Sequence, residues 1–150
     1  MSEENTAITW QQAKLLNAYY RKVGLTAAGK GDGCPTFSTF RAGYNAALVG
    51  PDTNDGVPTV ADIPMKLAEI ENVFHRGVVQ SDFSDDTALC VCEIPKGAVS
   101  EPVRFNVIGI YDQSDTLVAA ACTLTDWLTP EELDRSYLSI TFPMELEEGD

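Results

Sequence analysis

Residues 103–124 read VRFNVIGIYDQSDTLVAAACTL and carry the clearest structural signal of the chain. Apolar residues alternate in the first part of this stretch, with the period of a β-strand. Three of them are predicted to share one face of that strand: Val103, Phe105 and Val107. Asp112 begins a turn by composition, because its carboxylate can accept backbone N–H bonds. A second apolar run starts at Leu117, so the stretch predicts an antiparallel hairpin.

Two further strands are predicted on either side of this hairpin. Residues 88–94 (ALCVCEI) form a strand candidate that Pro95 stops. Over residues 137–146 (YLSITFPMEL), apolar residues from Leu138 to Leu146 alternate strictly with Ser139, Thr141, Pro143 and Glu145. Because proline cannot donate a ladder hydrogen bond, we expect this last strand at a sheet edge. Between the hairpin and this strand, residues 129–132 (TPEE) have the capping-box form and predict a short helical turn.

The first half of the chain instead shows helical spacing. Apolar residues recur every three or four positions in residues 8–23, with Thr9 as the expected N-cap and Gly24 as the stop. The same spacing predicts a helical stripe over residues 37–48 and a helix over residues 65–75. The segments between them, 24–36 and 49–64, are predicted loops, rich in glycine and proline. We therefore expect one α+β domain over residues 1–150, with an N-terminal helix or helices packed on an antiparallel β-meander.

Charge and composition argue against nucleic-acid binding, membrane binding and a membrane-spanning segment. The chain has 150 residues, is 44% hydrophobic and carries a formal net charge of −13. The charge is +2 over residues 1–50, −6 over 51–100 and −9 over 101–150. An acidic balance disfavours nucleic-acid and anionic-membrane partners, which need a cationic face. The chain contains no apolar run of about 18 residues, and its polar first residues predict no secretory signal.

No constellation in the sequence specifies a reaction, so we expect no enzyme activity, cofactor or metal. Residues 24–31 (GLTAAGKG) approach a phosphate-binding loop, but Gly31 stands where a Ser or Thr would hold magnesium. Residues 52–56 (DTNDG) approach a calcium loop, but Ile63 stands where glutamate is needed. His75 has no triad partner nearby and is expected as a partly exposed residue at the end of an element.

The four cysteines are predicted to be reduced, buried and structural: Cys34, Cys90, Cys92 and Cys122. Their spacing lacks the paired CxxC pattern of a zinc site. Two of them are separated by a single residue in a predicted strand, which disfavours a disulfide between them.

A set of short motifs occurs in a fixed order along the chain. They are Gly-Asp-Gly at 31–33, IENVFHR at 70–76, CEIP at 92–95, FNVIGIYD at 105–112 and LVA at 117–119. In this order they resemble the N-terminal domain of phage tail-fibre proteins. Three departures accompany the resemblance. Ile108 replaces a glutamate of that family, Asp115 or Thr116 replaces its turn glycine, and WLTP at 127–130 replaces an aromatic-Lys-Pro segment.

The resemblance implies a structural virion protein, made in the host cytoplasm, that sits at the baseplate or tail end and attaches tail fibres. Its partners would be other tail or baseplate subunits and the fibres, with no nucleic acid or membrane. It would form a trimer or symmetric copies around the tail. Since the chain ends at Asp150 without a shaft, we expect an attachment component rather than a whole fibre. The expected interaction residues are Gly31, Asp32, Gly33, Gly109, Tyr111 and Asp112. Gly31 and Gly33 are expected to supply positive φ, and Gly109, in the middle of a strand, to allow a close approach or a bulge.

The charge distribution leaves a second hypothesis open. With −9 on its last fifty residues, the chain could be a small binding module that targets a basic soluble partner through an acidic face. Binding that collapses with added salt would distinguish this module from a tail protein.

Overall fold

The computed structural model describes residues 12–31, 33–50, 56, 59–84, 87–95, 98–129 and 135–143. Within these ranges, the side chains of 84, 125, 126 and 135–143 lie outside the description. The predicted turn at 129–132 and the last residues of the predicted strand 137–146 fall largely on residues that are not described.

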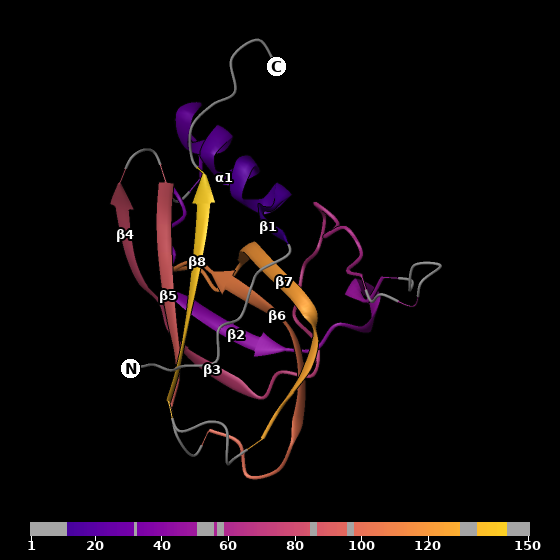
Figure 1. Ribbon diagram of the computed structural model, residues 1–150. Helices are drawn as coiled ribbons and strands as arrows, with labels where there is room; N and C mark the ends of the chain where they lie inside the picture. The colour runs from indigo at the N-terminus through magenta and orange to yellow at the C-terminus, as the bar shows by residue number, and fades with distance from the viewer. Residues whose placement is uncertain are drawn as a thin grey trace.

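Strands make up most of the regular structure (Figure 1). In chain order the elements are β1 Gln12–Leu15, α1 Asn17–Ala27, β2 Thr39–Gly43, the 3-10 helix η1 Ala46–Leu48, β3 His75–Val78, β4 Gln80–Ser84, β5 Thr87–Pro95, β6 Val103–Tyr111, β7 Leu117–Leu128 and β8 Arg135–Pro143. They form a five-stranded sheet in the order β1-β7-β6-β2-β3 and a three-stranded sheet in the order β4-β5-β8. The pairings of these strands are antiparallel.

The two sheets face each other across one hydrophobic core, as a β-sandwich does. The three-stranded sheet contributes Cys90, Cys92 and Ile94 of β5 to this core, and the five-stranded sheet contributes residues that include Phe40, Phe105 and Ile108. Val79 is also buried there, between β3 of one sheet and β4 of the other, so the chain changes sheets at that residue.

The five-stranded sheet is covered on its other face as well. A second core holds Leu16, Leu48, Ile63, Ile70, Val107, Tyr111, Leu117, Ala120 and Cys122. Three of these residues, Leu48, Ile63 and Ile70, come from the irregular segment between β2 and β3. β6 is therefore buried on both faces, which explains its nearly continuous burial from Phe105 to Tyr111.

The expected fold class is wrong. Strands account for 46% of the structure and helix for 14%, so this is a mainly β fold and not a set of helices packed on a meander. In the described part of the chain, α1 is the α-helix, and it lies at one end of the sheets (Figure 1).

The predicted helix over residues 8–23 begins, with its expected N-cap Thr9, outside the described residues; it is wrong over residues 12–15 and too short at its end. Residues 12–15 form β1, which pairs with Ala119–Cys122 of β7, a run of small side chains in a strand more than a hundred residues away. The helix begins at Asn17 and continues through Gly24 to Ala27. It stops at Gly29, whose φ of +77° is accessible to glycine. The Lys30 N–H donates to the Leu25 carbonyl at 2.7 Å, which closes a Schellman motif.

The helical stripe over 37–48 and the helix over 65–75 are also wrong. Residues 39–43 form β2, which is held between β3 and β6 by hydrogen bonds on both edges. Residues 65–74 stay irregular because their backbone bonds to the end of β2 and to the residue that follows it. The Tyr44 N–H donates to the Glu71 carbonyl, and the Phe74 N–H donates to the Ala42 carbonyl.

The strands of the second half are confirmed. β5 spans the predicted strand 88–94, β6 coincides with 103–111, and β7 extends the predicted 117–124 to Leu128. β8 lies at an edge of its sheet, as the proline at 143 indicates. One detail is wrong: Phe105 and Val107 point into different cores, because the register shifts between them.

A buried polar contact lies at the irregularity between Phe105 and Val107. The buried Asn106 bonds the buried Asn45, accepting from its backbone N–H at 2.9 Å and donating to its carbonyl at 3.0 Å. Asn106 thereby satisfies two backbone groups of the irregular segment that covers the sheet, while the extra residues of the irregularity lie on β7 between Cys122 and Asp126.

Candidate functional site

The turn between β6 and β7 is organised by the carboxylate of Asp112. Its Oδ1 accepts hydrogen bonds from the backbone N–H groups of Ser114 at 2.9 Å and Thr116 at 3.0 Å. Asp115 adopts a φ of +62°, a conformation that favours glycine or asparagine.

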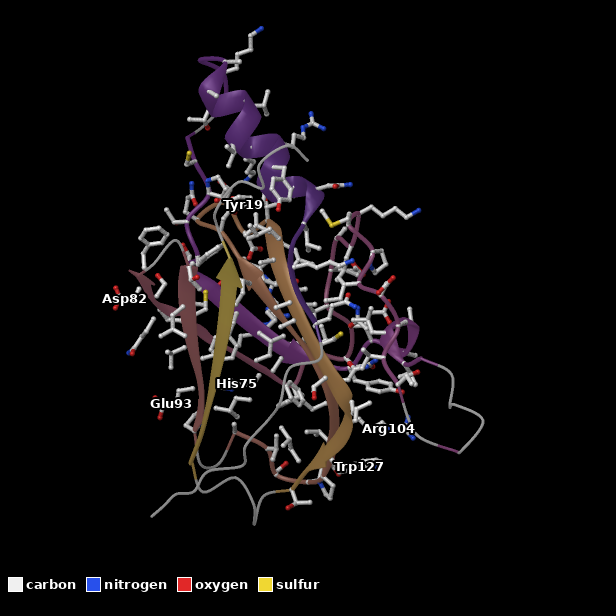
Figure 2. All side chains as sticks on the ribbon, turned by 45° about the horizontal axis from the view of Figure 1, so that its top comes forward. Tyr19, His75, Asp82, Glu93, Arg104 and Trp127 are labelled. Atoms are coloured by element: carbon white, nitrogen blue, oxygen red, sulfur yellow. The ribbon has the colours of Figure 1, made fainter. Side chains whose placement is uncertain are left out.

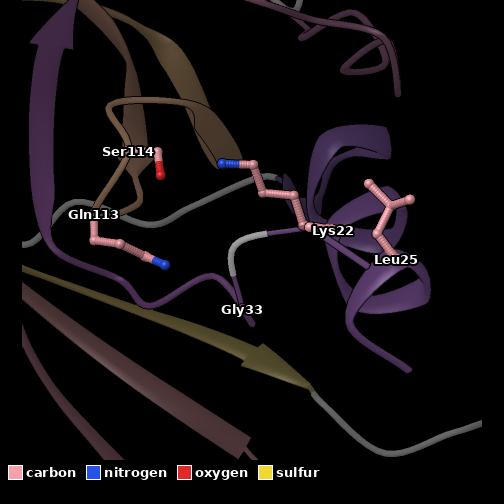
Figure 3. Close-up of a pocket in the computed structure, with 6 residues that line it drawn as sticks. Lys22, Leu25, Gly33, Gln113 and Ser114 are labelled. Atoms are coloured by element: carbon pink, nitrogen blue, oxygen red, sulfur yellow. The ribbon is translucent and has the colours of Figure 1, made fainter. Parts of the chain in front are cut away.

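Helix α1 is bound to this turn through Lys22. Its ammonium donates to Asp112 Oδ2 at 2.6 Å and to Thr116 Oγ1 at 3.1 Å. Burial raises the pKa of Asp112, but the bonds from Lys22, Thr116 and Ser114 together with the Lys22 charge outweigh that effect, so the pKa lies below its usual value. Figure 3 shows Lys22 extending from the helix toward the turn that carries Ser114.

Gln113 connects the same turn to the segment after α1. Its amide nitrogen donates to the Cys34 carbonyl at 3.1 Å, and its amide oxygen accepts from the Thr36 N–H at 2.9 Å. The turn, α1 and this segment surround a small pocket of about 100 Å³ lined by Lys22, Leu25, Gly31, Gly33, Gln113 and Ser114. That volume is below the roughly 300 Å³ at which small-molecule sites begin.

The structure brings the two glycines of the Gly-Asp-Gly motif to the turn between β6 and β7, although about eighty residues of sequence separate the motif from this turn. Gly31 has a φ of +81° and Gly33 a φ of +106°, which confirms the prediction that both positions require positive φ. Asp32 lies outside the described residues. We call the assembly of Lys22, Gly31, Gly33 and the turn 112–116 the hairpin end.

Tyr111 and Gly109 support the hairpin end from inside. Tyr111 is buried, and its hydroxyl accepts a 3.3 Å bond from the Ile70 N–H. The Arg41 guanidinium lies 3.9 Å from the centre of its ring and pairs with the exposed Asp115 carboxylate at 2.7 Å. Gly109 is approached so closely that an added Cβ would lie 2.5 Å from Cγ1 of Ile70, which confirms the predicted close approach.

Sequence reasoning selected part of this site and missed the rest. Asp112 was found because its role is local to the turn. Lys22, Arg41 and Gln113 were missed because their partners come from other elements. The residues next to a polar side chain in the sequence do not show which distant element it will contact. We find no sequence signal that would have paired Lys22 with Asp112.

The remaining sequence candidates do not gather into a reactive site. His75 begins β3 and is partly exposed, as predicted; burial lowers its pKa, and a hydrogen bond with the Glu93 backbone partly offsets this. Figure 2 shows it on the side where Glu93 lies. Within the described ranges, no three His, Cys, Asp or Glu side chains lie together so as to hold a metal ion. No helix found there is both long and apolar enough to cross a membrane.

The prediction of buried cysteines is confirmed at three positions and wrong at the fourth. Cys90, Cys92 and Cys122 are buried free thiols, whereas Cys34 is exposed. Burial raises the pKa of Cys90 to about 12, that of Cys92 further, and that of Cys122 to about 11. Since the thiolate is the reactive form, these three thiols are protected both sterically and chemically.

We therefore expect Cys34 alone to react quickly with a thiol reagent in the native protein at neutral pH. The other three should react only when the protein is unfolded in denaturant. Counting modified cysteines by mass spectrometry against time measures this directly. A Cys34→Ser variant should lose the fast phase, and fast modification of β5 in that variant would contradict the buried arrangement.

Comparisons with known proteins add no relative. Neither a family model, nor a curated protein, nor a solved structure matches this chain. The function must therefore be inferred from the motifs and the geometry of the chain itself.

Proposed function

We propose that this protein is a structural component of the tail of a phage or phage-like particle. It would sit at the baseplate or tail end and attach tail fibres through protein–protein contacts. Several copies, as a trimer or around the tail axis, would repeat the same contact by symmetry. The observation that carries the proposal is the convergence of the separate Gly-Asp-Gly and IGIYD motifs at the hairpin end.

The hairpin end suits a docking surface because it is rigid. Its turn is held by partly buried hydrogen bonds, by an ion pair to α1 and by a side-chain amide bonded to the segment after α1. A surface that is ordered before binding loses little conformational entropy in a complex. Gln113, Ser114 and Asp115 are exposed on this rigid frame, where a partner subunit can reach them.

The location of the protein is the first test. Immunogold labelling of intact particles, with antibody to this protein, should place gold at the distal end of the tail. Unlabelled particles, with all of the protein in the soluble lysate, would overturn the proposal. Salt-sensitive capture of a basic protein from that lysate would then favour the acidic binding module instead.

A paired substitution tests the contact surface. Ser114→Tyr places a bulky ring on the exposed turn and keeps the backbone N–H that donates to Asp112 Oδ1. We expect normal folding but a loss of incorporation into particles of about tenfold or more, as expected when a ring blocks a packed interface. The matched control is Ser100→Tyr, also exposed but located before the other end of β6, about 30 Å away by strand rise. Equal incorporation of the two variants would exclude the hairpin end.

A further inference from the structure

A second surface lies at the opposite end of β6 from the hairpin end. It is a groove of about 440 Å³ whose lining includes Tyr44, Asn72, Phe74, Pro102, Arg104 and Trp127. We call it the aromatic groove. Figure 2 shows Arg104 and Trp127 close together at that end of the molecule. The Trp127 side chain is 52% exposed, a large apolar surface to leave in water.

The sheet positions three of these side chains in a row. Arg104 of β6 and Trp127 of β7 are direct cross-strand partners, and Tyr44 follows the end of β2 on the other side of β6. The guanidinium carbon of Arg104 lies 5.3 Å from the centre of the Tyr44 ring and 5.3 Å from that of Trp127. Both distances are within the range of cation–π attraction, so the two rings hold the guanidinium between them.

The rim of the groove is fixed by hydrogen bonds. Arg104 Nη1 donates to the Tyr44 hydroxyl at 3.4 Å, and the Asn72 amide donates to the Tyr44 carbonyl at 2.8 Å. Asn72 has a φ of +51°, a conformation that asparagine tolerates better than most residues. The groove is therefore preformed in the unbound protein.

The charge of the groove is opposite to that of the protein. In a chain of net charge −13, Arg104 is the charged residue among the groove lining. The two ion pairs among the described side chains, Lys22–Asp112 and Arg41–Asp115, do not involve Arg104. A guanidinium presents several donors in a planar fork that matches a carboxylate, so an acidic group is the complementary ligand.

The aromatic walls indicate what else the ligand carries. Grooves lined by aromatic rings bind extended proline-containing segments, because the proline rings pack flat on the walls and the segment is already stiff. Trp, Tyr and Arg are also the residue types that contribute most to protein interfaces. We propose that the aromatic groove binds an extended, acidic, proline-containing segment of a partner protein. This contact is separate from the hairpin end and does not depend on its role.

A random library of short linear peptides tests the proposal. Selection on the wild-type protein should enrich sequences that combine proline with Asp or Glu. Binding of a selected peptide, followed by the Trp127 indole N–H signal in NMR, should weaken roughly tenfold or more in Arg104→Gln, because a charge-assisted bond is lost. The matched control is Arg76→Gln, an exposed arginine on β3 that should leave binding unchanged.

Three results would overturn the proposal. These are no enrichment above that on a Trp127→Ala protein, enrichment of basic peptides, and equal loss in the Arg104→Gln and Arg76→Gln variants. The carboxylate that Arg104 binds could belong to a peptide or to a saccharide. Oligomers of an acidic sugar, tested in the same NMR experiment, distinguish the two. If they shift the indole signal and no peptide does, the ligand is a saccharide and the proposal is wrong.

Discussion

Replacing Gly109 with alanine should destabilise the protein by about 2–3 kcal/mol, although the change adds one methyl group. The added Cβ would lie 2.5 Å from Cγ1 of Ile70 and 2.6 Å from Cδ1 of Leu117. Both neighbours belong to the second core, where Tyr111 and Val107 leave them little room to move. Because packed interiors do not absorb even one methylene freely, the strand or the covering segment must shift. Denaturant unfolding followed by circular dichroism measures the loss.

Gly24→Ala provides the matched control with the opposite sign. Gly24 lies exposed inside α1, and an added Cβ there meets no atom within 4 Å. Alanine should stabilise the helix by about 0.5–1 kcal/mol through lower backbone entropy and better propensity. Ile70→Ala should partly relieve the Gly109→Ala variant, so the double variant should be more stable than the sum of the single changes. Strict additivity would contradict the packing explanation.

The second large effect concerns the carboxylate that organises the hairpin end. Asp112→Asn should cost about 2–4 kcal/mol, because it removes one member of a buried ion pair and leaves an amide facing the Lys22 ammonium. The Asp112 side chain is fully buried and Lys22 is only partly exposed, so solvent replaces the lost partner poorly. The same denaturant experiment measures this difference.

Acidification should reproduce part of that loss in the wild-type protein. The pKa of Asp112 is lower in the folded chain than its ordinary value of 3.8. The unfolded chain therefore takes up the proton first, and the stabilisation by Asp112 is complete only above that ordinary value. As the pH falls below it and through the lower folded pKa, this stabilisation is lost. Unfolding measured at a series of pH values should show the loss in wild type and not in Asp112→Asn.

Asp115→Asn is the control for this residue type within the same turn. Asp115 pairs with Arg41 at 2.7 Å, but its side chain is 69% exposed. Exposed ion pairs contribute at most about 1 kcal/mol, and asparagine accepts the positive φ of this position. A cost as large as that of Asp112→Asn would show that the turn does not depend on the buried carboxylate.

The sequence predicted local features well. The period of two in β5, β6 and β7, the turn at Asp112 and the edge position of β8 are all determined by neighbouring residues. So is the need for positive φ at Gly31 and Gly33. Each follows from chemistry within a few positions, which a single sequence records directly.

The first half of the chain was misjudged because apolar spacing of three and four does not by itself make a helix. Leu15 and Leu16 are buried in different cores, as a strand end allows. Residues 39–43 become a strand because β3 and β6 supply hydrogen bonds on both edges. Such pairing outweighs the few tenths of a kcal/mol per residue of helix propensity. Asn106, between Phe105 and Val107, likewise has its hydrogen-bond partner far away in sequence, in Asn45, sixty-one residues before it.

By itself, then, the sequence determined the strands and turn of the second half, the acidic charge, and the order of the short motifs on which the proposed function rests. Only the tertiary structure decided that the fold is a mainly β sandwich, that Lys22 closes onto Asp112, and that Tyr44, Arg104 and Trp127 line one groove. The physical reason is the range of the interactions. Turn chemistry and strand alternation act between near neighbours, whereas sheet pairing, buried ion pairs and aromatic contacts join residues whose partners are known only once the chain has folded.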